Sequence, residues 1–163
     1  GSESSSGELS DIRLELAQSL EPDQHTISEE ERSQWQLAWA RALAAAGKTN
    51  EAARRYGAVL HSEKDNVDAQ YEYAQLLADS GDRASLEKAL KLWLDVLAAA
   101  TPESQRWFEA KYRLAQTHFQ LGDPERAAKI IRLTQVLHPE LGTPQLKQQF
   151  AELLARCQAE SSQ

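Results

Sequence analysis

The stretch from Trp107 to Pro139 constrains the fold most, because it contains two helical patterns separated by a turn signal. Gly122 suits the left-handed conformation that ends a helix, Asp123 can cap the next helix, and Pro124 suits its first turn. One such hairpin cannot bury both of its apolar faces, so the pattern predicts neighbouring hairpins of the same kind. The two apolar stripes are Phe108, Tyr112, Ala115 and Phe119, followed by Ala127, Ile130, Ile131, Thr134 and Leu137.

The same turn glycine occurs twice more in the chain. Gly47 and Gly81 are 34 residues apart, whereas Gly81 and Gly122 are 41 residues apart. A spacing of 34 residues is the tetratricopeptide period. Small residues recur around these glycines. Ala40, Ala74 and Ala115 each lie seven residues before one, and Ala52, Ala89 and Ala127 follow by five, eight and five residues.

On these residues, the chain resembles the tetratricopeptide repeat family from about residue 33 to 140. The family's first-helix tryptophan is replaced by Gln36, Gln70 and Lys111, and of its closing prolines only Pro139 is in register. The resemblance implies an all-α fold, namely a right-handed α-superhelix (solenoid) of helical hairpins. It also implies a non-catalytic scaffold that binds a protein or peptide partner.

The predicted organisation centres on residues 28–158. A polar leader (1–8) and a short helix with its loop (9–27) precede repeats at about 33–66, 67–107 and 108–141, a capping helix (144–158) and a frayed tail (159–163), with fraying expected from Ala155. The Gly-Ser start and the absence of methionine indicate a cloning remnant in front of an excised part of a longer protein. The short helix, with Leu9, Ile12, Leu16 and Leu20 as its stripe, either covers the first repeat or belongs to a preceding unit.

Two local features refine the helix ends. Ser28 and Glu31 form a predicted capping box at the start of the first repeat's helix. The seven extra residues of the second repeat are expected in two places: a longer turn over 82–87, and an over-long helix from about 102 to 120 that begins at Thr101-Pro102-Glu103.

Composition argues against several classes of function. Residues 1–33 contain nine acids and two bases, whereas the remainder contains 16 of each, so the repeats lack the excess of Lys and Arg that phosphate binding needs. An RNA-binding helical repeat is therefore the weakest alternative.

The sequence also lacks the patterns of metal sites and common enzymes. The histidines lack metal-ligand spacing, no nucleotide-binding or hydrolase motif is present, and no apolar run is long enough to span a membrane. We therefore expect no enzyme activity, no cofactor and no bound metal. His118 is expected to be structural and Cys157 to be a packed thiol.

The family register predicts which residues line a concave groove. Four acids against two bases make that wall mildly negative, and three aromatic residues supply anchors for an extended or helical peptide of neutral-to-basic character. The predicted partner-binding residues are Arg41, Tyr71, Glu72, Gln75, Glu109, Tyr112, Arg113, Gln116 and Phe119, with Asp68, Asp79 and Gln120 beside them.

Two further expectations concern partners. The residues in register with the family's carboxylate-binding set are Leu37, Arg41, Glu72, Glu109 and Arg113; only Arg113 has the required type, so we expect no binding of an acidic chaperone tail. The alternative function is self-association through the stripes at 10–20 and 145–157. Capping within one molecule is the competing use of those stripes, and it predicts a monomer.

Overall fold

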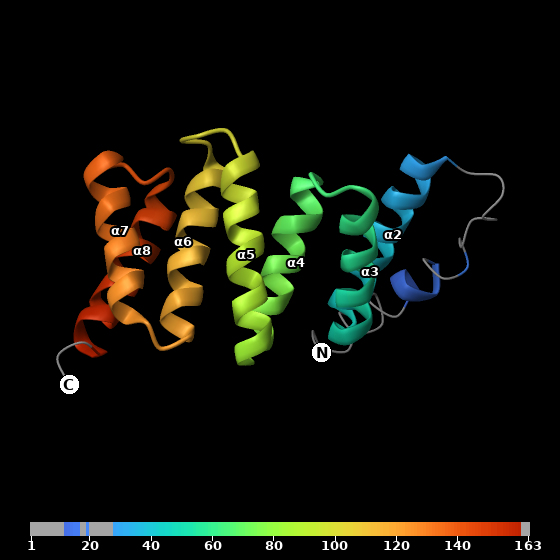
Figure 1. Cartoon of the computed structure of the whole chain (residues 1–163), viewed down its shortest axis with the longest axis horizontal. Helices are drawn as coiled ribbons and strands as arrows, with labels where there is room; N and C mark the ends of the chain where they lie inside the picture. Colours follow the sequence, from blue (N-terminus) through green and yellow to red (C-terminus); the bar gives the residue numbers. More distant parts are fainter. Residues whose placement is uncertain (1–11, 17–18, 20–27, 161–163) are drawn as a thin grey trace. The chain divides into compact units, whose positions relative to one another are not determined.

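The computed structural model describes residues 12–16, 19 and 28–160, and every regular element in this part of the chain is an α-helix (Figure 1). The all-helical prediction is therefore confirmed. Contacts divide the chain into two compact units, unit 1 (Gly1–Ala69) and unit 2 (Gln70–Gln163). Residues 12–16 are helical. The helices that follow are α2 (Glu29–Ala45), α3 (Thr49–Ser62), α4 (Val67–Ser80), α5 (Arg83–Ala99), α6 (Gln105–Gln120), α7 (Pro124–Leu137) and α8 (Pro144–Glu160).

The turn glycines behave as predicted. Gly47, Gly81 and Gly122 have φ angles of 73°, 72° and 80°, in the left-handed region that side chains disfavour. After Gly122, the Asp123 carboxylate accepts a hydrogen bond from the Arg126 amide at 3.0 Å, and Pro124 occupies the first turn of α7. The backbone itself therefore imposes the hairpin between α6 and α7.

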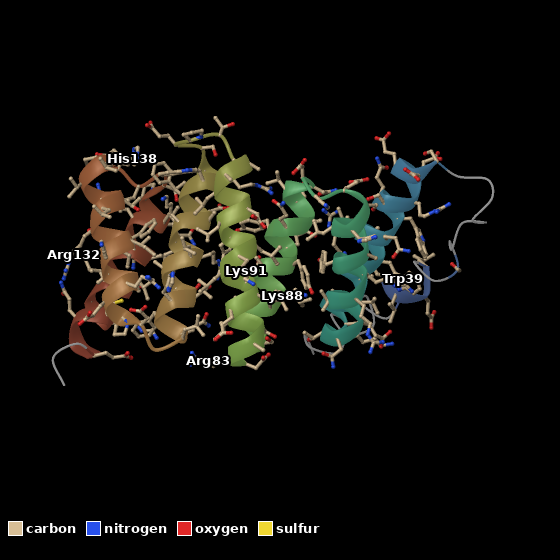
Figure 2. All side chains as sticks on the ribbon, in the orientation of Figure 1. Trp39, Arg83, Lys88, Lys91, Arg132 and His138 are labelled. Atoms are coloured by element: carbon tan, nitrogen blue, oxygen red, sulfur yellow. The ribbon has the colours of Figure 1, made fainter. Side chains whose placement is uncertain are left out.

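In unit 1, α2 and α3 pack against each other as a hairpin. The capping box is confirmed: the Ser28 amide donates to Glu31 Oε2 at 2.9 Å, and the Glu31 amide donates to Ser28 Oγ at 3.2 Å. Trp39, which Figure 2 labels, lies beneath the Arg55 guanidinium, whose carbon is 3.3 Å from the ring centroid. This cation–π contact joins the two helices of the hairpin.

In unit 2, successive helices from α5 to α8 pack on their neighbours, and α6 also contacts α8. The small residues Ala115 and Ala127 are fully buried, which lets α6 and α7 approach closely. Their core cluster is Phe108, Ala115, Ala127, Ala128, Ile131, Leu141, Leu146, Phe150, Leu153 and Cys157. The apolar stripe of α8 is thus buried inside unit 2, as a capping helix requires.

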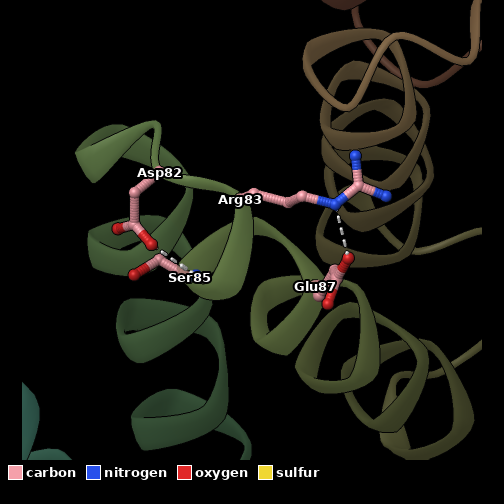
Figure 3. Close-up of polar contacts among 4 residues, drawn as sticks. All are labelled: Asp82, Arg83, Ser85 and Glu87. Carbon is pink, nitrogen blue, oxygen red and sulfur yellow. Dashed lines mark hydrogen bonds and ion pairs between the residues drawn. The ribbon is translucent and has the colours of Figure 1, made fainter.

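The predicted long turn over 82–87 is wrong, because α5 begins at Arg83. Asp82 is its N-cap and accepts a hydrogen bond from the Ser85 amide at 3.0 Å, and Arg83 pairs with Glu87 at 3.0 Å one turn later (Figure 3). The cap directs these residues into the helix. As a result, α5 has 17 residues, whereas α3 and α7 have 14.

The predicted helix start near residue 102 is also wrong. α6 begins at Gln105, with Ser104 as its N-cap and Ser104 Oγ accepting from the Trp107 amide at 3.2 Å. Glu103 has a φ of 64°, which interrupts any helix at that point. The helix that carries most of the predicted groove residues is therefore not over-long at its start.

Three expectations about helix faces and ends need correction. Ile12 and Leu16 are about half exposed, whereas Leu14 is buried; Leu9 and Leu20 lie outside the described residues. Leu137 is exposed, because the core-facing stripe of α7 continues from Thr134 to the half-buried His138. At the other end, α8 continues to Glu160, so residues 155–160 are helical.

Candidate functional site

A pocket of about 220 Å³ lies in unit 2 between α6 and α8. We call it the α6–α8 pocket. It is lined by Tyr71 of α4, by Gln105, Glu109, Tyr112 and Arg113 of α6, by Thr143, and by Gln145, Leu146 and Gln149 of α8.

The polar side of the pocket follows from the spacing of residues on α6. Gln105, Glu109 and Arg113 are four residues apart, so they share one helix face, while Phe108 and Ala115 face the core. Glu109 is held from two sides: Gln105 Nε2 donates to it at 2.9 Å and the Tyr71 hydroxyl at 3.3 Å. Its carboxylate is therefore fixed in position before any ligand arrives.

Two tyrosines supply the aromatic walls. The Tyr71 ring meets Trp93 edge-on with centroids 5.3 Å apart, and the Arg106 guanidinium lies 5.1 Å from its centroid. Tyr112 meets Phe150 edge-on at 5.4 Å. Burial raises the pKa of both hydroxyls, and the nearby Glu109 charge raises the pKa of Tyr71 further. Both side chains therefore remain neutral hydrogen-bond donors near neutral pH.

Four of the nine predicted partner-binding residues line the pocket: Tyr71, Glu109, Tyr112 and Arg113. Gln116 accepts a hydrogen bond from Arg113 Nη1 at 3.0 Å, and Phe119 lies 4.6 Å from the Arg156 guanidinium carbon. Glu72, Gln75, Gln116 and Phe119 do not line it, and Arg41 belongs to unit 1.

Sequence reasoning missed the contribution of the last helix to this pocket. Gln145 and Gln149 are four residues apart on α8, which the sequence predicted only as a capping helix. The signal was the pair of glutamines with Leu146 beside them. Which helix they would face could be decided only by the packing of α8 on α6.

His118 and Cys157 do not line the pocket. His118 is partly buried, and this burial, together with the charge of Arg126, lowers the pKa of its imidazole. Cys157 is fully buried in the unit 2 core, as predicted, and burial raises the pKa of its thiol. Within residues 12–16, 19 and 28–160, no group of three or more His, Cys, Asp or Glu side chains could hold a metal ion.

Successive antiparallel helical hairpins define the class of helical-repeat proteins. Residues 37–105 match the family model described as "Tetratricopeptide repeat", so this part of the chain carries the repeat that the sequence resembles. Such repeats are typically non-catalytic and serve as protein-interaction scaffolds. None of the helices that the structure describes is long and apolar enough to cross a membrane.

Solved structures with a similar fold include "MamA MSR-1 C2", with a TM-score of 0.66 and 12% identity, where the match covers 98% of this chain and 87% of that chain. "MamA RS-1 ArsTM double mutant" is similar with a TM-score of 0.54 and 18% identity, covering 96% of this chain and 95% of that chain. Identities this low show a shared fold only. No curated protein sequence matches the chain.

Proposed function

We propose that the chain is a protein-interaction scaffold that holds a segment of a partner protein at the α6–α8 pocket. The observation that carries the proposal is that four predicted partner-binding residues meet α8 glutamines around one pocket. The pocket volume of about 220 Å³ is below the roughly 300–1,000 Å³ of small-molecule sites. It suits one side chain of a peptide that continues along the surface.

The chemistry of the walls favours a peptide backbone as ligand. The amides of Gln145 and Gln149 each offer donors and an acceptor, which match the N–H and C=O groups of an extended chain. Gln105 adds its amide oxygen as an acceptor, because its nitrogen already donates to Glu109. The rings of Tyr71 and Tyr112 provide apolar contact next to those amides. A segment with one aromatic or aliphatic anchor residue fits this combination.

The charges around the pocket indicate the net charge of the segment that it would bind. Glu109 faces the same pocket as Arg113, while the Arg106 guanidinium lies over the Tyr71 ring, 5.1 Å from its centroid. The wall of the pocket is therefore not acidic, whereas the full set of predicted groove residues carries four acids and two bases. We accordingly propose a segment that is close to neutral.

Displayed libraries of random linear peptides can test this proposal. Panning on the immobilised full chain is expected to enrich sequences with an aromatic or aliphatic anchor. The double variant Gln145→Arg/Gln149→Arg fills the pocket with long side chains and is expected to weaken the selected peptides by roughly tenfold or more. Tyr112→Ala is a poorer choice, because the ring also packs on Phe150.

The matched control is Gln148→Arg on the same helix. Gln148 is exposed, hydrogen-bonds to Glu152 at 2.8 Å and does not line the pocket, so its replacement is expected to leave peptide binding unchanged. Undiminished binding to the double variant would show that the pocket is not the binding surface. Failure to enrich any peptide would contradict the proposal as a whole.

A further inference from the structure

The outward face of α7 carries a continuous strip of exposed basic and apolar side chains, which we call the α7 strip. Its members are Arg126, Lys129, Arg132, Leu133, Val136 and Leu137. The three apolar residues are 54%, 78% and 70% exposed, in sequence order. Figure 2 shows Arg132 projecting outward from α7. Spacings of three and four residues place all six on one side of the helix, and none of them lines the α6–α8 pocket.

The repeats themselves provide an internal comparison for this strip. Counted from the packed alanine of each second helix, Leu133, Val136 and Leu137 correspond to Asp95, Ala98 and Ala99 of α5, and to Ala58, His61 and Ser62 of α3. All six of these counterparts are exposed, and they are small or polar. Large apolar side chains at these positions are therefore a property of α7 and not a requirement of the repeat.

The same comparison indicates that a further hairpin stacked after α7 would not cover the α7 strip. In unit 2, α6 and α7 follow α5, yet Asp95, Ala98 and Ala99 remain exposed. A hairpin stacked in the same way after α7 would leave Leu133, Val136 and Leu137 exposed as well. Contiguous exposed apolar groups of this kind mark an interaction surface.

Charge specifies the kind of partner. Lys129 and Arg132 flank the apolar residues, and Arg126, which pairs with the N-cap Asp123 at 3.9 Å, lies at the start of the strip. Glu125 is the one exposed acid within α7. A complementary surface has an apolar stripe at helical spacing with carboxylates beside it. We infer that the α7 strip binds an acidic amphipathic helix of a partner protein.

An anionic membrane surface fits the strip less well. Glu140 and Glu103 have side chains that are 90% and 68% exposed, and Glu103 contacts His138, the C-cap of α7, at 3.5 Å. Glu140 pairs with Lys147 at 3.4 Å, so Glu103 is the acid that a broad anionic surface would approach next to the apolar end of the strip. A single helix can lie along α7 and avoid it.

Two synthetic peptides test the inference by fluorescence anisotropy with the full chain. Both have leucine at every third or fourth position, and the other positions are glutamate in one peptide and lysine in the other. The glutamate peptide is expected to bind and the lysine peptide is not. Val136→Glu is expected to weaken binding by roughly tenfold or more, and so is Arg132→Glu. Ala98→Glu, at the matching position of α5, is the control and is expected to change nothing.

Val136 and Arg132 are exposed, so both variants are expected to keep the wild-type unfolding midpoint. Equal binding of the two peptides, or a glutamate peptide that tolerates both variants, would overturn the inference. Cosedimentation with phosphatidylserine-containing vesicles, lost in Val136→Glu, would instead identify the strip as a membrane-binding surface.

Discussion

At the residue scale, two turn glycines share a left-handed backbone but differ in what surrounds them. Gly122 and Gly142 have φ angles of 80° and 82°, so any side chain there is strained. A Cβ at Gly122 would meet nothing within 4 Å. A Cβ at Gly142 would lie 3.0 Å from Cδ2 of the buried Phe108 ring.

This difference predicts a graded loss of stability. Gly122→Ala is expected to lower the free energy of unfolding by about 1–2 kcal/mol through the left-handed backbone alone. Gly142→Ala is expected to cost more, because the methyl group also displaces Phe108. Urea unfolding measures both changes. Equal losses would contradict the contact with Phe108. The control is Gly57→Ala in helix α3, where an added Cβ would meet nothing within 4 Å. This change should stabilise the fold, because alanine favours a helix more than glycine does.

At the element scale, stability depends on how closely the helices approach each other. Ala127 is fully buried in the core cluster of unit 2, where α7 meets its neighbours. Ala52 and Ala89 have the corresponding place in α3 and α5 and are also fully buried. A larger side chain at any of these positions would force the helices apart.

We therefore expect Ala127→Leu to lower the free energy of unfolding by about 1–3 kcal/mol. The control is Ala98→Leu, which makes the same chemical change at an exposed position of α5 and should alter stability by less than about 0.5 kcal/mol. Urea unfolding followed by circular dichroism compares the two. If the two variants unfold alike, the close packing at Ala127 is not limiting.

At the scale of the whole molecule, the burial of the apolar stripes near the two ends of the chain determines whether they can pair between molecules. Leu146, Phe150, Leu153 and Cys157 of α8 are all buried within unit 2. This stripe is therefore not available for pairing between molecules, although Ile12 and Leu16 remain about half exposed. The observation supports capping within one chain at the C-terminal end.

The chain is accordingly predicted to be monomeric. Light scattering across a dilution of about a hundredfold should give a constant monomer mass, because association would make the mass depend on concentration. A mass that rises with concentration in the wild type, but not in Leu16→Glu, would instead establish assembly through the N-terminal stripe.

The local elements of this protein were predictable from the sequence because their causes are local. The glycines at 47, 81 and 122, the Ser28–Glu31 capping box and the Asp123-Pro124 start each act through backbone atoms a few residues away. The alanines at 52, 89 and 127 recur at the matching position of each second helix, where close helix packing requires a small side chain. The fold and three repeat registers could therefore be inferred before any contact was known.

What only the tertiary structure decided depends on contacts between residues far apart in the sequence. The packing of α8 on α6 brings Gln145 and Gln149 to the pocket, while Gln75 and Phe119 on the predicted wall do not line it. His138 rather than Leu137 continues the core-facing stripe, because burial depends on where the neighbouring helix lies. Helix periodicity defines the faces of a helix, but the position of its neighbours determines which face is covered.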